Sequence, residues 1–231
     1  MENREEFLVA IARKLGRPVR HIPEAMPEPV NTLATTRLTE LTSDQRCEAF
    51  IKFASEVMLV ECVLVLPEDA PSKALDICWK FGSGSVIISN DQRLVDTGIT
   101  PLLQKEMGAA LWNPEKGDEN IHLAEKAKTG VVFAEYGLTE SGGIVLFSAP
   151  ERGRSVSLLP EASLFVLRKS TILPRVAQLA QKLHEMAQEG QRLPSCINLI
   201  GGPSSTADIE LIKVVGVHGP VHATYLIIDD C

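Results

Sequence analysis

Two glycine-rich segments of this sequence contain polar residues that could take part in catalysis or ligand binding. In the first, residues 137–143, one carboxylate, Glu140, stands between the hydroxyls of Thr139 and Ser141 and is followed by Gly142. Small residues let backbone amides approach a ligand closely, and hydroxyls donate or accept hydrogen bonds. Glu140 could therefore act as a nucleophile, as a base, or as an acceptor for a ligand hydroxyl. The alternative is a tight connection between strands, in which the glycines satisfy backbone angles and Glu140 points to water.

The second segment, residues 201–210, directly follows an apolar run at 196–200 that is typical of a strand. Open α/β sheets bind ligands at glycine-rich turns after their strands, where backbone amides and hydroxyls can hold an anion. We therefore predict a site for a small carboxylate or a phosphate-bearing ligand here. Its candidate contacts are Gly202, Ser204, Ser205, Thr206, Asp208, Glu210 and, from a later turn, His218. Alternatively, Thr206 or Asp208 caps a short helix, and His218 anchors its turn.

Neither segment is a known cofactor motif. The patterns Gly-x-Gly-x-x-Gly and Gly-Lys-Ser/Thr, which bind dinucleotides and nucleoside triphosphates, are both absent. The 5 cysteines are never spaced as Cys-x-x-Cys, so they do not form a cluster-binding motif. We therefore predict no bound cofactor and no metal ligands within this chain.

Before the first of these segments, helical patterns alternate with strand patterns along the sequence. Thr42 with Gln45 is typical of a capping box and predicts a helix to about residue 58. Further helices are predicted at 71–81, 100–107 and 120–128, and strands at 62–66, 85–89 and 131–136. Short, nearly all-apolar strands between helices indicate a sheet covered on both faces. The predicted fold class is α/β, with an open, mostly parallel sheet flanked by helices.

The pattern changes after residue 137. Apolar runs at 143–148, 156–159 and 163–167 follow one another with turns and no helix, which predicts a smaller antiparallel portion. A long amphipathic helix is predicted at 173–188, followed by strands at 196–200 and 224–228.

The first forty residues differ in character from the rest. Residues 1–16 have helical spacing, and residues 17–36 contain Pro18, Pro23, Pro27 and Pro29, which favour an extended arm. Such an arm wraps its own domain or a second subunit, so a homo-oligomer is possible. We predict an N-terminal helix and proline-rich arm at 1–40 and an α/β domain at 41–231.

Composition excludes several classes of function. The net charge of −7 and the pI near 5.3 oppose non-specific binding to nucleic acid. The apolar runs are too short to span a membrane, and the charged start of the chain is unlike a signal peptide. We expect a cytoplasmic protein without a membrane span.

Three segments together resemble the lactate utilisation protein C family: Thr-Glu-Ser-Gly-Gly-Ile-Val-Leu at 139–146, Gly-Pro-Ser-Ser-Thr-Ala-Asp-Ile-Glu at 202–210, and Gly-Val-His-Gly-Pro at 216–220. The resemblance covers roughly residues 41–230. It implies a fold similar to ribose-phosphate isomerases, coenzyme A transferases and formyltetrahydrofolate cyclo-ligases. It also implies a role as the subunit without a cluster beside two iron–sulfur subunits, in a complex that oxidises L-lactate to pyruvate. Clusters are then expected only in those partners.

The first motif departs from the family, in which it usually reads Ala-Glu-Thr-Gly-Thr. Glu140 and Gly142 are kept, whereas Gly143 lacks the last hydroxyl and leaves Thr139 or Ser141 to replace it. Two other functions stay open. The chain could be an independent enzyme of the coenzyme A transferase or cyclo-ligase kind, with Glu140 as the catalytic carboxylate that forms an acyl or phosphoryl intermediate. It could also be a binding or scaffolding module.

Overall fold

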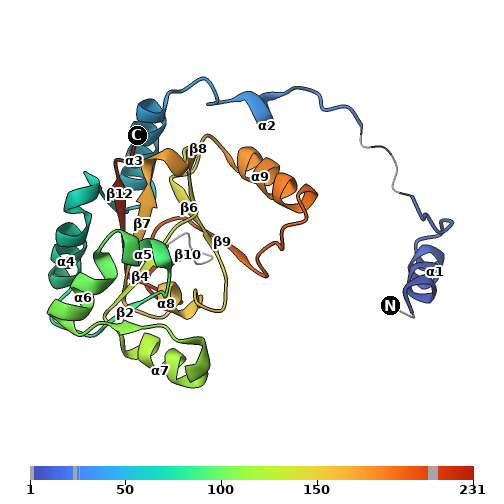
Figure 1. Cartoon of the computed structure of the whole chain (residues 1–231). Helices are drawn as coiled ribbons and strands as arrows, with labels where there is room; N and C mark the ends of the chain where they lie inside the picture. The colour runs from blue at the N-terminus through green and yellow to red at the C-terminus, as the bar shows by residue number, and fades with distance from the viewer. Residues whose placement is uncertain (1–2, 23–24, 26, 208–212) are drawn as a thin grey trace. The chain divides into compact units, whose positions relative to one another are not determined.

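The computed structural model describes every residue except 1–2, 23–24, 26 and 208–212. The chain divides into two compact units, residues 1–32 and residues 33–231. The first unit contains helix α1 (Arg4–Lys14), and the second contains all the sheets (Figure 1). The boundary expected at residue 40 stays a prediction.

The second unit is built on a six-stranded sheet in the order β1-β12-β7-β4-β2-β3. All its strand pairs are parallel. The strands are β1 (Glu61–Val65), β2 (Val86–Ile88), β3 (Ala110–Leu111), β4 (Thr129–Phe133), β7 (Ala162–Arg168) and β12 (His222–Ile228). The predicted fold class is therefore confirmed.

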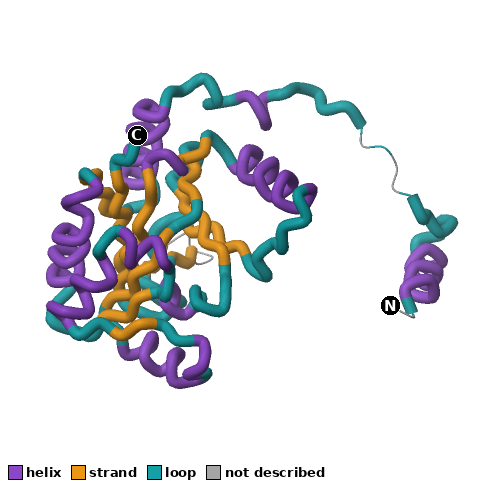
Figure 2. The backbone as a smooth tube through the Cα atoms, in the orientation of Figure 1, coloured by secondary structure: helices purple, strands orange, loops and turns teal. Residues whose placement is uncertain are grey.

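Helices cover both faces of this sheet (Figure 2). Because successive side chains of a strand point to opposite faces, Val131 and Phe133 of β4 pack with one set of helices and Val132 with the other. The first set is α4 (Ala70–Lys80), α5 (Gln92–Asp96) and α6 (Ile99–Met107). The second is α3 (Ser43–Glu56), α7 (Asp118–Lys126) and α8 (Ser155–Leu158).

A second sheet of four strands, in the order β8-β5-β6-β9, packs beside the second set of helices. Its strands are β5 (Tyr136–Leu138), β6 (Gly143–Phe147), β8 (Ile172–Leu173) and β9 (Ile197–Ile200), and β6 pairs antiparallel with both of its neighbours. Helix α9 (Val176–Gln188) packs Leu179 against Leu138 and Val145 of this sheet. After β9, the chain forms the hairpin of β10 (Ser205–Ala207) and β11 (Lys213–Val215).

Local signals in the sequence located most elements correctly. The capping box of α3 is confirmed, because the Thr42 hydroxyl accepts from the Gln45 amide and the Gln45 side chain accepts from the Thr42 amide. Among the residues that the structure describes, no helix is long and apolar enough to cross a bilayer.

Three predictions of local structure are wrong. Residues 156–159 lie mostly in α8 rather than in a strand, since a run this short has no readable period. Residues 163–167 belong to β7, which lies between β4 and β12 in the parallel sheet, and such long-range pairing leaves no local signal. The arm ends in a short helix, α2 (Leu33–Thr36), instead of staying extended to residue 36.

Candidate functional site

The first glycine-rich segment forms the turn from β5 to β6, and there Glu140 binds the start of α9. Its carboxylate accepts from the Arg175 Nε at 2.6 Å and from the Val176 backbone amide at 2.8 Å. Both carboxylate oxygens are therefore engaged within the chain. Hydrogen bonds from a guanidinium and an amide make a carboxylate a weaker nucleophile and hold it against α9, so this arrangement favours a capping role for Glu140.

The charge on Glu140 is stabilised by its surroundings. Burial alone would raise the pKa of this carboxyl, but the Val176 amide and the Arg175 guanidinium hold its pKa below the usual 4.5. The positive end of a helix dipole acts in the same direction, because the carboxylate lies at the first turn of α9. Glu140 is thus ionised at neutral pH and stabilises the docking of α9.

A Glu140→Gln variant should lose about 1–2 kcal/mol of unfolding free energy at neutral pH, because the amide keeps the shape but loses the charge. A lowered pKa in the folded state means that this stabilisation is present above the unfolded value of 4.5 and is lost as the pH falls through the folded value. Urea unfolding at about pH 7 and about pH 3 should therefore show the two proteins converging in acid. An equal difference at both pH values would show that the charge is not the cause.

The two hydroxyls beside Glu140 are also used locally. Thr139 is buried and donates to the Leu173 carbonyl at 3.0 Å. The Ser141 hydroxyl accepts from the Gly143 amide at 3.3 Å. These contacts shape the turn between β5 and β6.

The glycines of both glycine-rich segments pack against the C-terminal end of one helix, α3. Gly142 has φ +60°, and a Cβ there would lie 2.6 Å from the Ala54 nitrogen. Gly202 has φ +79°, and a Cβ there would lie 2.4 Å from the Met58 carbonyl oxygen. Ala54 lies in the last turn of α3 and Met58 follows that helix. The structure thus brings one glycine of each segment close to the C-terminal end of α3.

The second segment lines a cavity of about 320 Å³, here called the hairpin pocket. Of the predicted contacts, Gly202, Ser204, Ser205 and His218 line it. The Gly202 amide donates to the Tyr225 hydroxyl at 3.4 Å, and the Ser204 amide donates to the Pro220 carbonyl at 2.9 Å. The pocket is therefore held in shape by these amides, and its side-chain hydroxyls and His218 are the groups offered to a ligand.

Of the other predicted contacts, Thr206 does not line the hairpin pocket. Thr206 is exposed in the middle of β10, opposite Val214, so it does not begin a helix. Asp208 and Glu210 lie outside the described residues. The segment around Glu140 does not line the hairpin pocket. A ligand role for all the predicted contacts stays a prediction.

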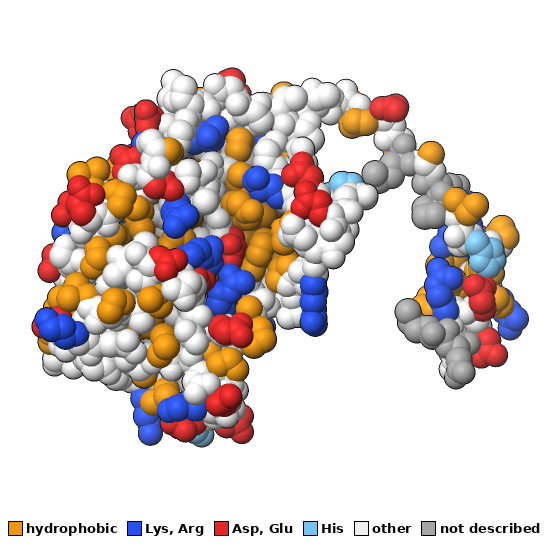
Figure 3. All heavy atoms as spheres, viewed as in Figure 1, with side chains coloured by type: hydrophobic (Ala, Val, Ile, Leu, Met, Phe, Trp, Pro, Cys, Tyr) orange, Lys and Arg blue, Asp and Glu red, His pale blue; other side chains and the backbone are white. Residues whose placement is uncertain are grey.

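A second polar site, which the sequence did not reveal, lies where β2 and β4 end. Asp91 follows β2 and Glu135 follows β4, and Arg93 of α5 bridges them. Arg93 donates to Asp91 at 2.9 and 2.7 Å and to Glu135 at 2.7 and 2.8 Å. Arg152 completes this network by an ion pair with Glu135 and lies 3.7 Å from Asp91. Lys and Arg side chains gather over α5 in Figure 3.

The network is partly shielded from water. The side chain of Asp91 is 5% exposed and that of Glu135 is 17% exposed. Burial alone would raise the pKa of Asp91, but hydrogen bonds and charge from Arg93, with Arg152 nearby, hold its pKa below the usual 3.8. The Arg93 guanidinium also lies 4.6 Å from the centre of the Phe133 ring. A charged residue within three positions of the end of a buried strand was the available signal for this site, but Asp91 also caps α5, which is an ordinary role.

The described residues include no group of three or more His, Cys, Asp or Glu side chains placed to hold a metal ion. Burial raises the pKa of Cys47 to about 11 and that of Cys78 to about 12. These thiols stay protonated at neutral pH, and they pack as small core side chains.

Comparison with known proteins identifies relatives along the whole chain. A family model of the LUD domain matches residues 48–228. The uncharacterized protein YkgG of Escherichia coli (strain K12) is 64% identical over 100% of both chains. Lactate utilization protein C of Bacillus subtilis (strain 168) is 38% identical over 100% of this chain and 98% of its own length. The protein of the same name from Geobacillus sp. (strain WCH70) is 36% identical over 100% of this chain and 97% of its own length.

A solved structure shares the fold. The crystal structure of a DUF162 family protein from Deinococcus radiodurans superposes with a TM-score of 0.57 and 19% identity. The match covers 81% of this chain and 99% of that one.

Proposed function

The chain belongs to the LUD domain family, and we propose that it is the subunit without a cluster in an iron–sulfur complex that oxidises L-lactate to pyruvate. The observation that carries this proposal is the full-length similarity to proteins named lactate utilization protein C. In this proposal the complex works in the cytoplasm.

The chemistry requires partners. Oxidation of L-lactate to pyruvate releases two electrons and two protons, and some group must accept the electrons. This chain has no Cys-x-x-Cys motif, and its 5 cysteines are dispersed along the sequence. The electrons therefore pass to clusters in the partner subunits, and this chain contributes binding and positioning.

Within such a complex, the hairpin pocket is the place we assign to a small carboxylate or phosphate-bearing ligand. It follows β9 in the chain and offers the hydroxyls of Ser204 and Ser205 beside His218. Hydroxyls and a histidine can bind an anion by donating hydrogen bonds.

Affinity purification from cells growing on L-lactate tests the partnership. The tagged chain should co-elute with polypeptides that contain iron and acid-labile sulfide, because they are its electron acceptors. A strain that lacks the chain should fail to grow on L-lactate and grow normally on pyruvate, and the intact gene should restore growth. Isolation of the chain alone, together with normal growth of the deletion strain, would contradict the proposal.

A further inference from the structure

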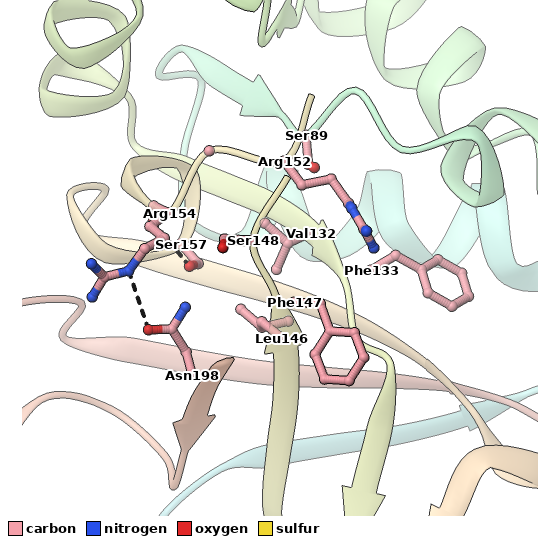
Figure 4. Close-up of a pocket in the computed structure, with 11 residues that line it drawn as sticks. Ser89, Val132, Phe133, Leu146, Phe147, Ser148, Arg152, Arg154, Ser157 and Asn198 are labelled. Carbon is pink, nitrogen blue, oxygen red and sulfur yellow. Dashed lines mark hydrogen bonds between the residues drawn. The ribbon is translucent and has the colours of Figure 1, made fainter. Parts of the chain in front are cut away.

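A groove lies beside the network of Asp91, Arg93 and Glu135, on the side of the small sheet. Its inner recess, shown in Figure 4, has a volume of about 20 Å³. Apolar side chains line it together with the polar residues Ser89, Ser148, Arg152, Arg154, Ser157 and Asn198. Its outer part is an open cleft of about 550 Å³. The two parts share Ser148 and Arg152 and form one continuous surface, which we call the arginine groove.

The groove lies where this type of sheet binds ligands. From β2 the chain crosses outward to β3, and from β4 it continues in the opposite direction to β7 and β12. The order of strands therefore reverses between β2 and β4, and open α/β sheets bind ligands in the crevice outside the carboxyl ends of such strands. Ser89, the residue directly after β2, lines the recess. The network of Asp91, Arg93 and Glu135 bridges the same two strand ends.

The charge of the groove opposes that of the protein. The chain has a net charge of −7, yet the groove lining contains Arg152, Arg154 and Arg192. Among its described lining residues none is an aspartate or a glutamate. An acidic protein with a concentrated positive surface attracts anions to that surface.

The three arginines are held to different degrees. Arg152 is fixed by its ion pair with Glu135, so its guanidinium is oriented in advance. The Arg154 Nε donates to the Asn198 side chain at 3.2 Å, which leaves its terminal nitrogens for other acceptors (Figure 4). In the described part of the chain, neither Arg154 nor Arg192 forms an ion pair, and both are exposed. Planar guanidinium groups bind carboxylate and phosphate oxygens in pairs.

The volumes of the two parts of the groove indicate the size of the ligand that it can bind. The outer cleft has the volume typical of sites for ligands much larger than lactate. The inner recess has room for about one water molecule or one ligand oxygen. We propose that the arginine groove binds an organic anion with several negative charges, an organic phosphate or a polycarboxylate, at a site that adjoins the hairpin pocket only through Ser157.

Isothermal titration calorimetry of the full chain tests this proposal. The salt concentration is about 0.15 M, so that weak electrostatic attraction to the surface is screened. The probes are ADP, pyrophosphate, citrate and L-lactate. We expect ADP or citrate to bind saturably and L-lactate to bind far more weakly. Tighter binding of ADP than of citrate would indicate a site for a phosphate, and tighter binding of citrate would indicate a site for a carboxylate. The Arg154→Gln/Arg192→Gln variant should bind the same probe at least about ten-fold more weakly, which corresponds to about 1.4 kcal/mol.

Lys126→Gln is the matched control, because Lys126 is an exposed cation on α7 outside the groove lining. It should keep the affinity of the unmodified chain. Arg154 and Arg192 are exposed, so their replacement should leave the thermal unfolding temperature unchanged. Absence of saturable binding to the unmodified chain, or equal affinity in the double arginine variant, would overturn the proposal. Either result would leave copurification with iron–sulfur partners unaffected.

Discussion

Replacement of Arg93 by alanine should lower the free energy of unfolding by about 3 kcal/mol, the lower end of the loss expected when one partner of a buried ion pair is removed, because the Arg93 side chain is 26% exposed. The side chain of Arg93 makes four hydrogen bonds, two to Asp91 and two to Glu135. Without it, two shielded carboxylates would face each other with only Arg152 to balance them. The contact of Arg93 with the Phe133 ring would be lost as well.

The deficit should depend on pH in a defined direction. In the unmodified protein Arg93 lowers the pKa of Asp91, so this carboxylate contributes stability above its usual pKa of 3.8 and loses it as the pH falls. In Arg93→Ala that pKa rises, and the carboxylate takes up a proton more readily. The difference in unfolding free energy between the two proteins should therefore shrink from about pH 7 towards about pH 4.

Urea unfolding measures this effect, and Arg154→Ala provides the matched control. Arg154 comes from the same region but is exposed, so its loss should change stability by less than about 0.5 kcal/mol. Arg93→Lys should recover little of the stability, because one ammonium cannot form the paired contacts of a guanidinium with both carboxylates. A loss in Arg93→Ala no greater than that of the control would show that the network contributes little to the fold.

The sequence predicted the parts of the fold that are determined locally. The Thr42 and Gln45 pair marks the start of α3, and short apolar strands between helices indicate the covered parallel sheet. It did not predict that β7 enters the centre of that sheet, because strands of any origin look alike when both of their faces are buried. The hairpin of β10 and β11 was also missed, since it is only three residues long on each side.

The candidate sites show the same limit. Composition and glycine content singled out the segment that lines the hairpin pocket, because a strand followed by Gly-Gly is a local pattern. The arginine groove and its neighbouring network combine residues 89–93, 135, 152–154 and 192, which come together only through the order of the strands. Arginine and glutamate are ordinary surface residues in a sequence, so only the fold reveals that they converge.

The glycines of the two motifs allow a sharper test of what those motifs do. Replacement of Gly142 or of Gly202 by alanine should lower the free energy of unfolding by about 2–5 kcal/mol. The left-handed backbone of alanine accounts for about 1–2 kcal/mol of this loss, and overpacking by the new Cβ accounts for about 1–3 kcal/mol. At Gly142 the new Cβ would meet the Ala54 backbone at 2.6 Å, and at Gly202 the Met58 carbonyl oxygen at 2.4 Å. Backbone atoms at a helix end cannot move aside as a flexible side chain could.

Gly190→Ala separates the two causes. Gly190 has φ +72° like the motif glycines, but a Cβ there would meet nothing within 4 Å. Its replacement should therefore cost only the backbone part, about 1–2 kcal/mol. Larger losses at Gly142 and Gly202 than at Gly190, in urea unfolding, would measure the contact with α3 directly.

The double variant Gly142→Ala/Gly202→Ala then tests whether both glycines serve the same helix. Once the first Cβ has displaced the end of α3, the second meets less resistance, so the combined loss should be smaller than the sum of the single losses. Strictly additive losses would mean that the two segments dock independently. If either single variant kept full stability and yet failed to support growth on L-lactate, close approach of a ligand, rather than of α3, would be the reason for a glycine at that position.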